Sequence, residues 1–202
     1  PKGTRRETFQ QIFKKNFPNL KPVIFFSFFF SFSFSSWHSF LAPTVSWIGV
    51  GAISTFGGGY GTGAFMTRLG ISTRIDTGKK RMIAIASLTI YGLGLALIPH
   101  AIYSWELGMI GFICGMSHGV YYPAMSAFAV ERFHPLHTGN AMSLYLSASS
   151  LGMFLGPPLW GFVGDRGGYV WIFAAAGFFL ICSTLAFVIS RSWSPARKLL
   201  WK

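Results

Sequence analysis

The stretch MTRLGISTRIDTGKKRM, residues 66–82, holds five cations and one acid between two long apolar runs. The cations are Arg68, Arg74, Lys79, Lys80 and Arg81, and the acid is Asp76. The whole chain of 202 residues is 51% hydrophobic and only 11% charged, whereas soluble domains carry roughly 25% charged residues. Because a soluble fold so poor in charge would expose a large apolar surface, we predict a protein of the lipid bilayer.

The gaps between charged residues predict six transmembrane helices, since one such helix needs about 20 mainly apolar residues. The first gap can hold two helices with a turn at Pro43, and each later gap fits one. The expected spans are residues 23–41, 45–67, 82–98, 107–130, 140–163 and 170–189. Within the first span, FFSFFFSFSFSSW partly alternates as a strand would, but the chain lacks the repeated ten-residue alternation of a membrane barrel. We therefore expect an all-α membrane protein.

The lysines and arginines predict how the helices are oriented. Loops on the side of the two termini hold 16 of the 17 Lys and Arg residues, and the opposite loops hold only Arg166. Positively charged loops stay in the cytoplasm, so both termini are expected there, in a plasma membrane or a bacterial inner membrane. The expected domains are a basic linker at 1–21, a six-helix domain at 22–190 and a basic tail at 191–202. Within the linker, ETFQQIFKKNF forms an apolar helical face that suits either the membrane interface or another protein surface.

Several other functions lack the residues they need. A pI of about 10.2 is typical of nucleic-acid-binding proteins, but such a domain should be soluble, so we expect no nucleic acid partner. The glycine-rich GGGYGTGA at 57–64 lacks the strand and turn of a nucleotide-binding motif and is interpreted as helix packing. Cys114 and Cys182 fall in separate spans, and His134 and His137 have few further ligands nearby. We expect no metal, no cofactor and no enzymatic activity.

A short motif occurs at equivalent points of the two halves of the chain. Asp76-Thr-Gly78 follows the second expected span, and Asp165-Arg-Gly167 follows the fifth, on the opposite side of the membrane. The six spans would then be two inverted three-helix repeats, an arrangement that secondary transporters use.

The chain resembles the C-terminal six-helix half of a major facilitator superfamily transporter over about residues 21–190. YPAMSAFAVER and TGNAMSLY are similar to the end of the tenth and the start of the eleventh helix of that family. GMFLGPPLWGFVGDRGGY is similar to the Gly-Pro helix break and external turn that follow. RLGISTRIDTGKKR resembles the cytoplasmic loop signature of the family, although Arg74 precedes Asp76 here.

The resemblance implies secondary transport of a small solute by alternating access, with a second six-helix half as partner. That half would belong to the same polypeptide, to a separate chain or to a homodimer mate. The alternative is a non-transporting membrane subunit that packs within a larger membrane complex. The resemblance also implies three structural elements. The gating loop comprises Arg74, Asp76, Gly78, Lys79, Lys80 and Arg81. The helix break comprises Gly156, Pro157 and Pro158, and the external turn comprises Asp165, Arg166 and Gly167.

By the same resemblance, the first and fourth spans line a central cavity, with the second and fifth beside them. The candidate cavity residues are Trp37, His38, His118, Tyr121, Tyr122 and Tyr145. His118 is the strongest candidate, because an ionisable side chain in the middle of a charge-free helix is a functional hypothesis by default. A neutral histidine bonded to a neighbouring helix is the alternative, as aromatic packing is for Tyr121 and Tyr122.

Overall fold

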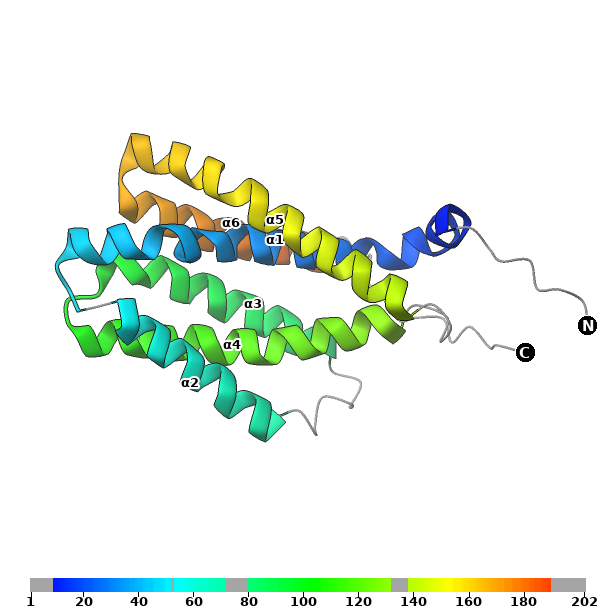
Figure 1. Ribbon diagram of the computed structural model, residues 1–202, viewed down its shortest axis with the longest axis horizontal. Helices are drawn as coiled ribbons and strands as arrows, with labels where there is room; N and C mark the ends of the chain where they lie inside the picture. The colour runs from blue at the N-terminus through cyan, green and yellow to red at the C-terminus, as the bar shows by residue number, and fades with distance from the viewer. Residues whose placement is uncertain (1–8, 52, 72–79, 132–137, 190–202) are drawn as a thin grey trace, which may run out of the picture.

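The structure, a computed structural model, describes residues 9–51, 53–71, 80–131 and 138–189, and helices make up nearly all of these ranges (Figure 1). The helices are α1 (Phe9–Ile48), α2 (Ile53–Ile71), α3 (Lys80–Leu97), the short η1 (Ile98–His100), α4 (Ser104–Glu131), α5 (Thr138–Gly167) and α6 (Tyr169–Ile189). The all-α prediction is confirmed for these residues. Residues 9–20, within the predicted linker, continue α1 as helix.

Three of the described helices are long and apolar enough to cross a membrane by length and composition alone. These segments are Lys21–Ile48, Met82–His100 and Tyr169–Ala186. The helices α2, α4 and α5 have 19, 28 and 30 residues, so length does not limit them, but their glycine, serine, threonine and proline residues lower their apolar content. Their place in the bilayer stays a prediction.

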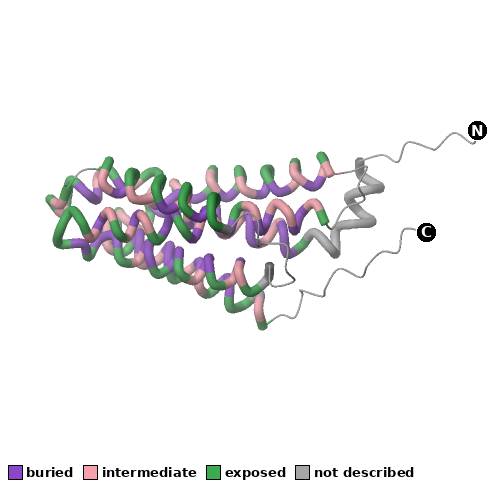
Figure 2. Tube along the Cα trace, turned by 90° about the horizontal axis from the view of Figure 1, so that it is seen from below, coloured by how far each residue is buried: buried purple, intermediate pink, exposed green. Residues whose placement is uncertain are grey.

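Large apolar side chains are exposed along the outer faces of the bundle. Phe178 on α6 is 70% exposed, Phe154 on α5 is 75% exposed and Leu69 on α2 is 66% exposed. Exposed residues recur along the length of the helices (Figure 2). A surface of this kind is costly in water and favourable in lipid, so it agrees with a bilayer location.

The turn between the first two helices lies later than the sequence analysis placed it. The turn was expected at Pro43, but α1 continues through Pro43 to Ile48. The chain reverses instead at Gly49 and Gly51, whose φ angles are 69° and 67°. Only glycine adopts this left-handed conformation without a steric penalty, whereas a proline can remain in a helix when neighbouring groups satisfy the freed carbonyl.

Glycines bring α2 and α4 into close contact. Gly59 and Gly63 on α2, four residues apart, face the backbone of α4; Gly111, Gly115 and Gly119 on α4, also spaced by four, face α2. A Cβ atom on Gly63 would lie 2.2 Å from the carbonyl oxygen of Phe112, and one on Gly115 would lie 2.0 Å from that of Tyr60. The predicted packing role of the glycine-rich segment is thus confirmed for Gly59 and Gly63, since small residues let helix backbones approach in lipid.

A second close pair joins α1 and α5. A Cβ atom on Gly152 would lie 2.3 Å from the carbonyl oxygen of Phe28. Ser31 and Ser149 share a hydrogen bond of 2.5 Å between their hydroxyl oxygens. The pair of α2 and α4 and the pair of α1 and α5 therefore both have glycines at an extended helix contact. In each pair, the two helices are far apart in the sequence.

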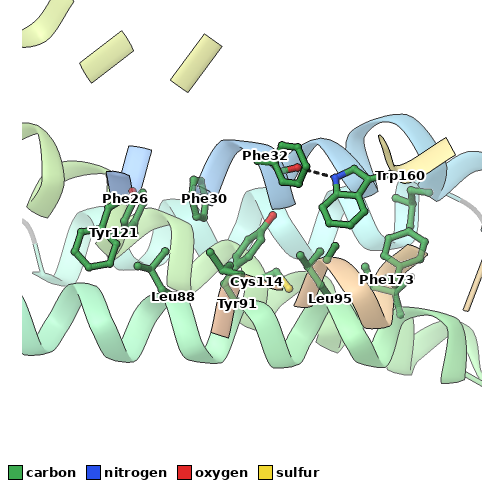
Figure 3. Close-up of a cluster of buried hydrophobic side chains, with 14 of the residues drawn as sticks. Phe26, Phe30, Phe32, Leu88, Tyr91, Leu95, Cys114, Tyr121, Trp160 and Phe173 are labelled. Carbon is green, nitrogen blue, oxygen red and sulfur yellow. Dashed lines mark hydrogen bonds between the residues drawn. The ribbon is translucent and has the colours of Figure 1, made fainter. Parts of the chain in front are cut away.

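The core of the bundle lies where α3 meets α4 and α6. Leu88, Tyr91 and Leu95 on α3 are fully buried. They pack with Phe30 on α1, Cys114 on α4 and Phe173 on α6, the members of one cluster drawn in Figure 3. Gly92 and Gly177 bring α3 and α6 together, because a Cβ on Gly177 would lie 2.3 Å from the Gly92 oxygen.

Candidate functional site

A cavity of about 290 Å³ lies between α1, α4 and α5. Each helix supplies side chains about one turn apart, so one face of each helix lines the cavity. The lining residues are Phe30, Ser31 and Phe34 of α1, His118 and Tyr122 of α4, and Tyr145, Leu146, Ser149, Ser150 and Met153 of α5. They come from the middle parts of their helices. Three of the six predicted cavity residues, His118, Tyr122 and Tyr145, are therefore brought together.

Aromatic rings surround His118. The centroid of its ring lies 5.2 Å from that of Phe30 and 5.5 Å from that of Phe34, both on α1. The ring of Tyr122, one turn further along α4, meets it edge to face at 6.1 Å. A partly enclosed neutral imidazole of this kind can donate one hydrogen bond and accept another.

The Nδ1 atom of His118 is hydrogen-bonded to the hydroxyl of Tyr60 on α2. Tyr60 is not among the residues that line the cavity, so it approaches His118 from outside it. Tyr60 is not among the residues predicted for the site, because the whole segment 57–64 was interpreted as helix packing. The signal was present: a tyrosine hydroxyl in the middle of an apolar span needs a hydrogen-bond partner.

Tyr122 and Tyr145 form the aromatic end of the cavity. Their ring centroids lie 5.8 Å apart, with an interplanar angle of 69°. Tyr145 is only 2% exposed, while Tyr122 is 37% exposed. Ser31, Ser149 and Ser150 add hydroxyl groups, and none of the cavity's lining residues is charged. These walls can stack against an uncharged aromatic group and hydrogen-bond its polar atoms, but they offer no ion pair.

The other predicted cavity residues lie elsewhere. Tyr121 is 1% exposed and lies on the core side of α4, where its ring centroid is 4.4 Å from that of Phe30. Its position agrees with the alternative of aromatic packing. Trp37 lies behind Tyr60, with 5.2 Å between their ring centroids. His38 is exposed and stacks on Phe34 at 6.1 Å. None of these three residues lines the cavity.

A shallower hollow continues along the outer face of α5. Its volume is about 620 Å³, and it shares Leu146 and Ser150 with the cavity. Its other lining residues are Ser143, Ser147, Leu151 and Phe154. The two hollows together form one serine-bearing face of α5, which the described helices leave open.

The remaining predicted elements have mixed outcomes. In the gating loop, Arg74, Asp76, Gly78 and Lys79 lie outside the described residues, and Lys80 and Arg81 begin α3. Helix α5 continues through Gly156, Pro157 and Pro158 to Gly167 and does not end at the prolines. A bend of the helix axis at these residues stays a prediction. Asp165, Arg166 and Gly167 are the last residues of α5, and the turn falls at Gly168, whose φ is 78°. Arg166 there covers the ring of Phe162 at 3.4 Å.

Residues 22–199 match the sequence model of the Major Facilitator Superfamily. The chain belongs to this family. Members of the Major Facilitator Superfamily are in general membrane transporters and not enzymes, so the chain is an integral membrane protein of the transporter type, as the sequence resemblance indicated. A comparison with curated proteins finds no significant match. Within the described ranges, no group of three His, Cys, Asp or Glu side chains could hold a metal ion.

Proposed function

We propose that this chain is the C-terminal half of a secondary transporter, which moves a small solute by alternating access around the cavity at His118. The cavity carries the proposal: it combines mid-helix residues of α1, α4 and α5 and is open on one side. Transporters of this kind bind substrate near the bilayer midplane, at the interface between repeats. The open side would be closed by a second six-helix half, from the same polypeptide, another chain or a homodimer mate.

The helix contacts support two inverted repeats, α1–α3 and α4–α6. The second helix of each triplet packs on the first helix of the other, α2 on α4 and α5 on α1. Both contacts use glycines, Gly63 in the first and Gly152 in the second. The third helices α3 and α6 contact each other through Gly92 and Gly177. A pseudo-two-fold axis in the membrane plane would relate these three contacts.

The charge pattern supports the orientation that we propose, with both termini and the loops after α2 and α4 in the cytoplasm. The 16 Lys and Arg residues on that side would also face anionic headgroups. On the opposite side, Glu106 at the start of α4 and Asp165 at the end of α5 lie near the turns. The family match does not favour the alternative of a non-transporting subunit.

Transport is tested by reconstitution of the full transporter in liposomes that are loaded with a mixture of cellular metabolites. Mass spectrometry then follows which solutes leave the liposomes. We expect at least one small solute to leave faster than from empty-membrane controls, and we expect His118→Leu to slow its exit. Phe178→Ala, at a 70% exposed position on α6, serves as the matched control. Equal retention of every solute with the active protein and with control membranes would contradict the proposal.

A further inference from the structure

The polar side chains behind the cavity form a line across four helices. Trp37 on α1, Tyr91 on α3 and Tyr60 on α2 lead to His118 on α4. The Tyr91 hydroxyl lies close to both the Trp37 indole and the Tyr60 hydroxyl, and it points toward α1 (Figure 3). Tyr60 in turn is bonded to His118 Nδ1. Each of these residues is thus a neighbour of the next.

Two of these polar atoms have no hydrogen-bond partner among the described residues. They are Nε1 of Trp37 and the hydroxyl of Tyr91, and both are buried. An unpaired polar group inside an apolar region is costly, so small side-chain rotations that pair them are favoured. Once both atoms are paired, it is fixed which residue donates and which accepts in every hydrogen bond of the line.

The donor of each bond follows from the chemistry of the indole. A tryptophan N–H can only donate, so in the paired arrangement Trp37 would donate to the Tyr91 oxygen. Tyr91 would then donate to the Tyr60 oxygen, and Tyr60 would donate to His118 Nδ1. In the opposite direction His118 would donate to Tyr60 and Tyr60 to Tyr91, which leaves the Tyr91 hydroxyl without an acceptor. Only the first direction pairs all three donors.

A histidine that accepts at Nδ1 carries its proton on Nε2 when it is neutral. Nδ1 is occupied by Tyr60, while His118 itself lines the cavity. We propose that Tyr60 is a positioning residue that holds His118 as an Nε2–H donor toward the cavity, which thereby selects uncharged aromatic solutes with a hydrogen-bond acceptor. The solute class rests on the proposed function, but the tautomer does not.

The walls of the cavity agree with this solute class. Phe30, Phe34 and Tyr145 offer ring faces and edges, and the walls contributed by this chain carry no charged side chain to balance an ion. Ser31 and Ser149 bond to each other, which uses one of their two hydroxyl protons, while the bond from Tyr60 to His118 fixes the orientation of the imidazole. A carbonyl or ether oxygen on an aromatic solute matches the Nε2–H donor.

The tautomer is read by ¹⁵N NMR of the full transporter in bilayers with labelled histidine, assigned by difference against His118→Gln. We expect the Nε2-protonated tautomer in the wild type and a mixture of both tautomers in Tyr60→Phe. Tyr122→Phe is the matched control, because the ring of Tyr122 lies perpendicular to that of His118, while the Nδ1 atom of His118 is bonded to Tyr60. An Nδ1-protonated wild type, or an unchanged tautomer in Tyr60→Phe, would overturn the proposal.

The solute class is tested with benzophenone, an uncharged aromatic ketone that reacts with nearby C–H bonds under light and prefers methionine. We expect it to label Met153 in the cavity, and we expect Tyr60→Phe and His118→Leu to lower that labelling several-fold. Met109, 52% exposed on α4, reports non-specific labelling from the lipid and should not change. Excess diphenylmethane, which lacks the carbonyl, should compete weakly. An unchanged Met153 to Met109 ratio in both variants would refute the acceptor preference, whatever the outcome of the transport assay.

Discussion

The indole N–H of Trp160 on α5 donates a hydrogen bond of 2.8 Å to the backbone carbonyl oxygen of Phe32 on α1 (Figure 3). The ring of Trp160 also lies 4.9 Å from that of Phe32, and the residue is only 4% exposed. This contact joins the first helix of one triplet to the second helix of the other. It therefore stabilises the arrangement on which the cavity depends.

Replacing this indole should weaken the bundle. Trp160→Phe removes the hydrogen bond and part of the packed ring, and we expect the free energy of unfolding to fall by about 1–2 kcal/mol. The measurement is thermal unfolding in detergent, followed by the reaction of a dye with Cys114, which is buried in the folded protein. Trp171→Phe, at a 61% exposed position, should leave the unfolding temperature unchanged. Equal losses in the two variants would contradict a specific role for Trp160.

Two glycines of α2 should respond in opposite ways to the same substitution. Gly63→Ala places a methyl group against the Phe112 carbonyl of α4, so we expect a loss of about 1–3 kcal/mol from overpacking. Gly61→Ala meets nothing within 4 Å and should be neutral or stabilise by up to about 1 kcal/mol, because alanine favours helix. Chemical denaturation of both variants in mixed micelles measures the difference. A harmless Gly63→Ala would show that α2 and α4 do not meet at this distance.

The acid at the start of α4 should stabilise that helix. The Oε2 atom of Glu106 accepts hydrogen bonds from the backbone N–H groups of Ile102, at 2.7 Å, and Tyr103, at 3.1 Å. Its negative charge also complements the N-terminal end of the helix dipole. We expect Glu106→Gln to lower the free energy of unfolding by about 1 kcal/mol. Asp165→Asn, at the C-terminal end of α5, should not destabilise, because an acid there opposes the helix dipole. Thermal unfolding of the two variants checks the contrast.

The imidazole of the cavity should matter for solute affinity. For the solute found in the liposome assay, we expect His118→Leu to raise KM about tenfold, since one neutral hydrogen bond contributes about 1 kcal/mol or slightly more. His38→Leu, in which the exposed histidine outside the cavity is removed, should leave KM unchanged. Initial rates of uptake at varied solute concentration distinguish the two. A His118→Leu transporter with wild-type KM would exclude this side chain from solute binding.

The proposed orientation is tested with single cysteines in a background where Cys114 and Cys182 are replaced by serine. A cysteine at Asp165 should react with a membrane-impermeant maleimide added outside intact cells. A cysteine at Gly139 should react only after the cells are opened. Both positions are exposed at helix ends, so a difference in reactivity reports the side of the membrane. Reversed reactivity of the two cysteines would invert the topology.

The sequence was sufficient for the helical class and the family, because both depend on composition and on contiguous motifs. It misplaced the first turn, since the effect of Pro43 depends on whether neighbouring groups accept the freed carbonyl, and that is a tertiary property. Gly49 and Gly51 carried the better signal, because a turn with positive φ angles favours glycine.

The site was predicted in part. His118 could be found because it is an isolated ionisable residue in an apolar span, and Tyr122 follows one turn later on the same face. Tyr121 was included wrongly, because adjacent residues on a helix point about 100° apart and the sequence alone does not say which face is the core. The sequence signals that the Tyr60 hydroxyl needs a hydrogen-bond partner, but the identity of this partner, His118, depends on the contact between α2 and α4, which joins residues far apart in the chain.

The reciprocal contacts of α2 with α4 and of α1 with α5 have a consequence for biosynthesis. A ribosome completes α1 long before α5 emerges, so Ser31 on α1 has no hydrogen bond to Ser149 until α5 has been inserted. A nascent chain halted after α3 has formed neither glycine contact and has few of its native neighbours. Folding is therefore delayed until the second triplet is inserted. Until then, lipid, the insertion machinery or a chaperone must cover the contact faces of the early helices.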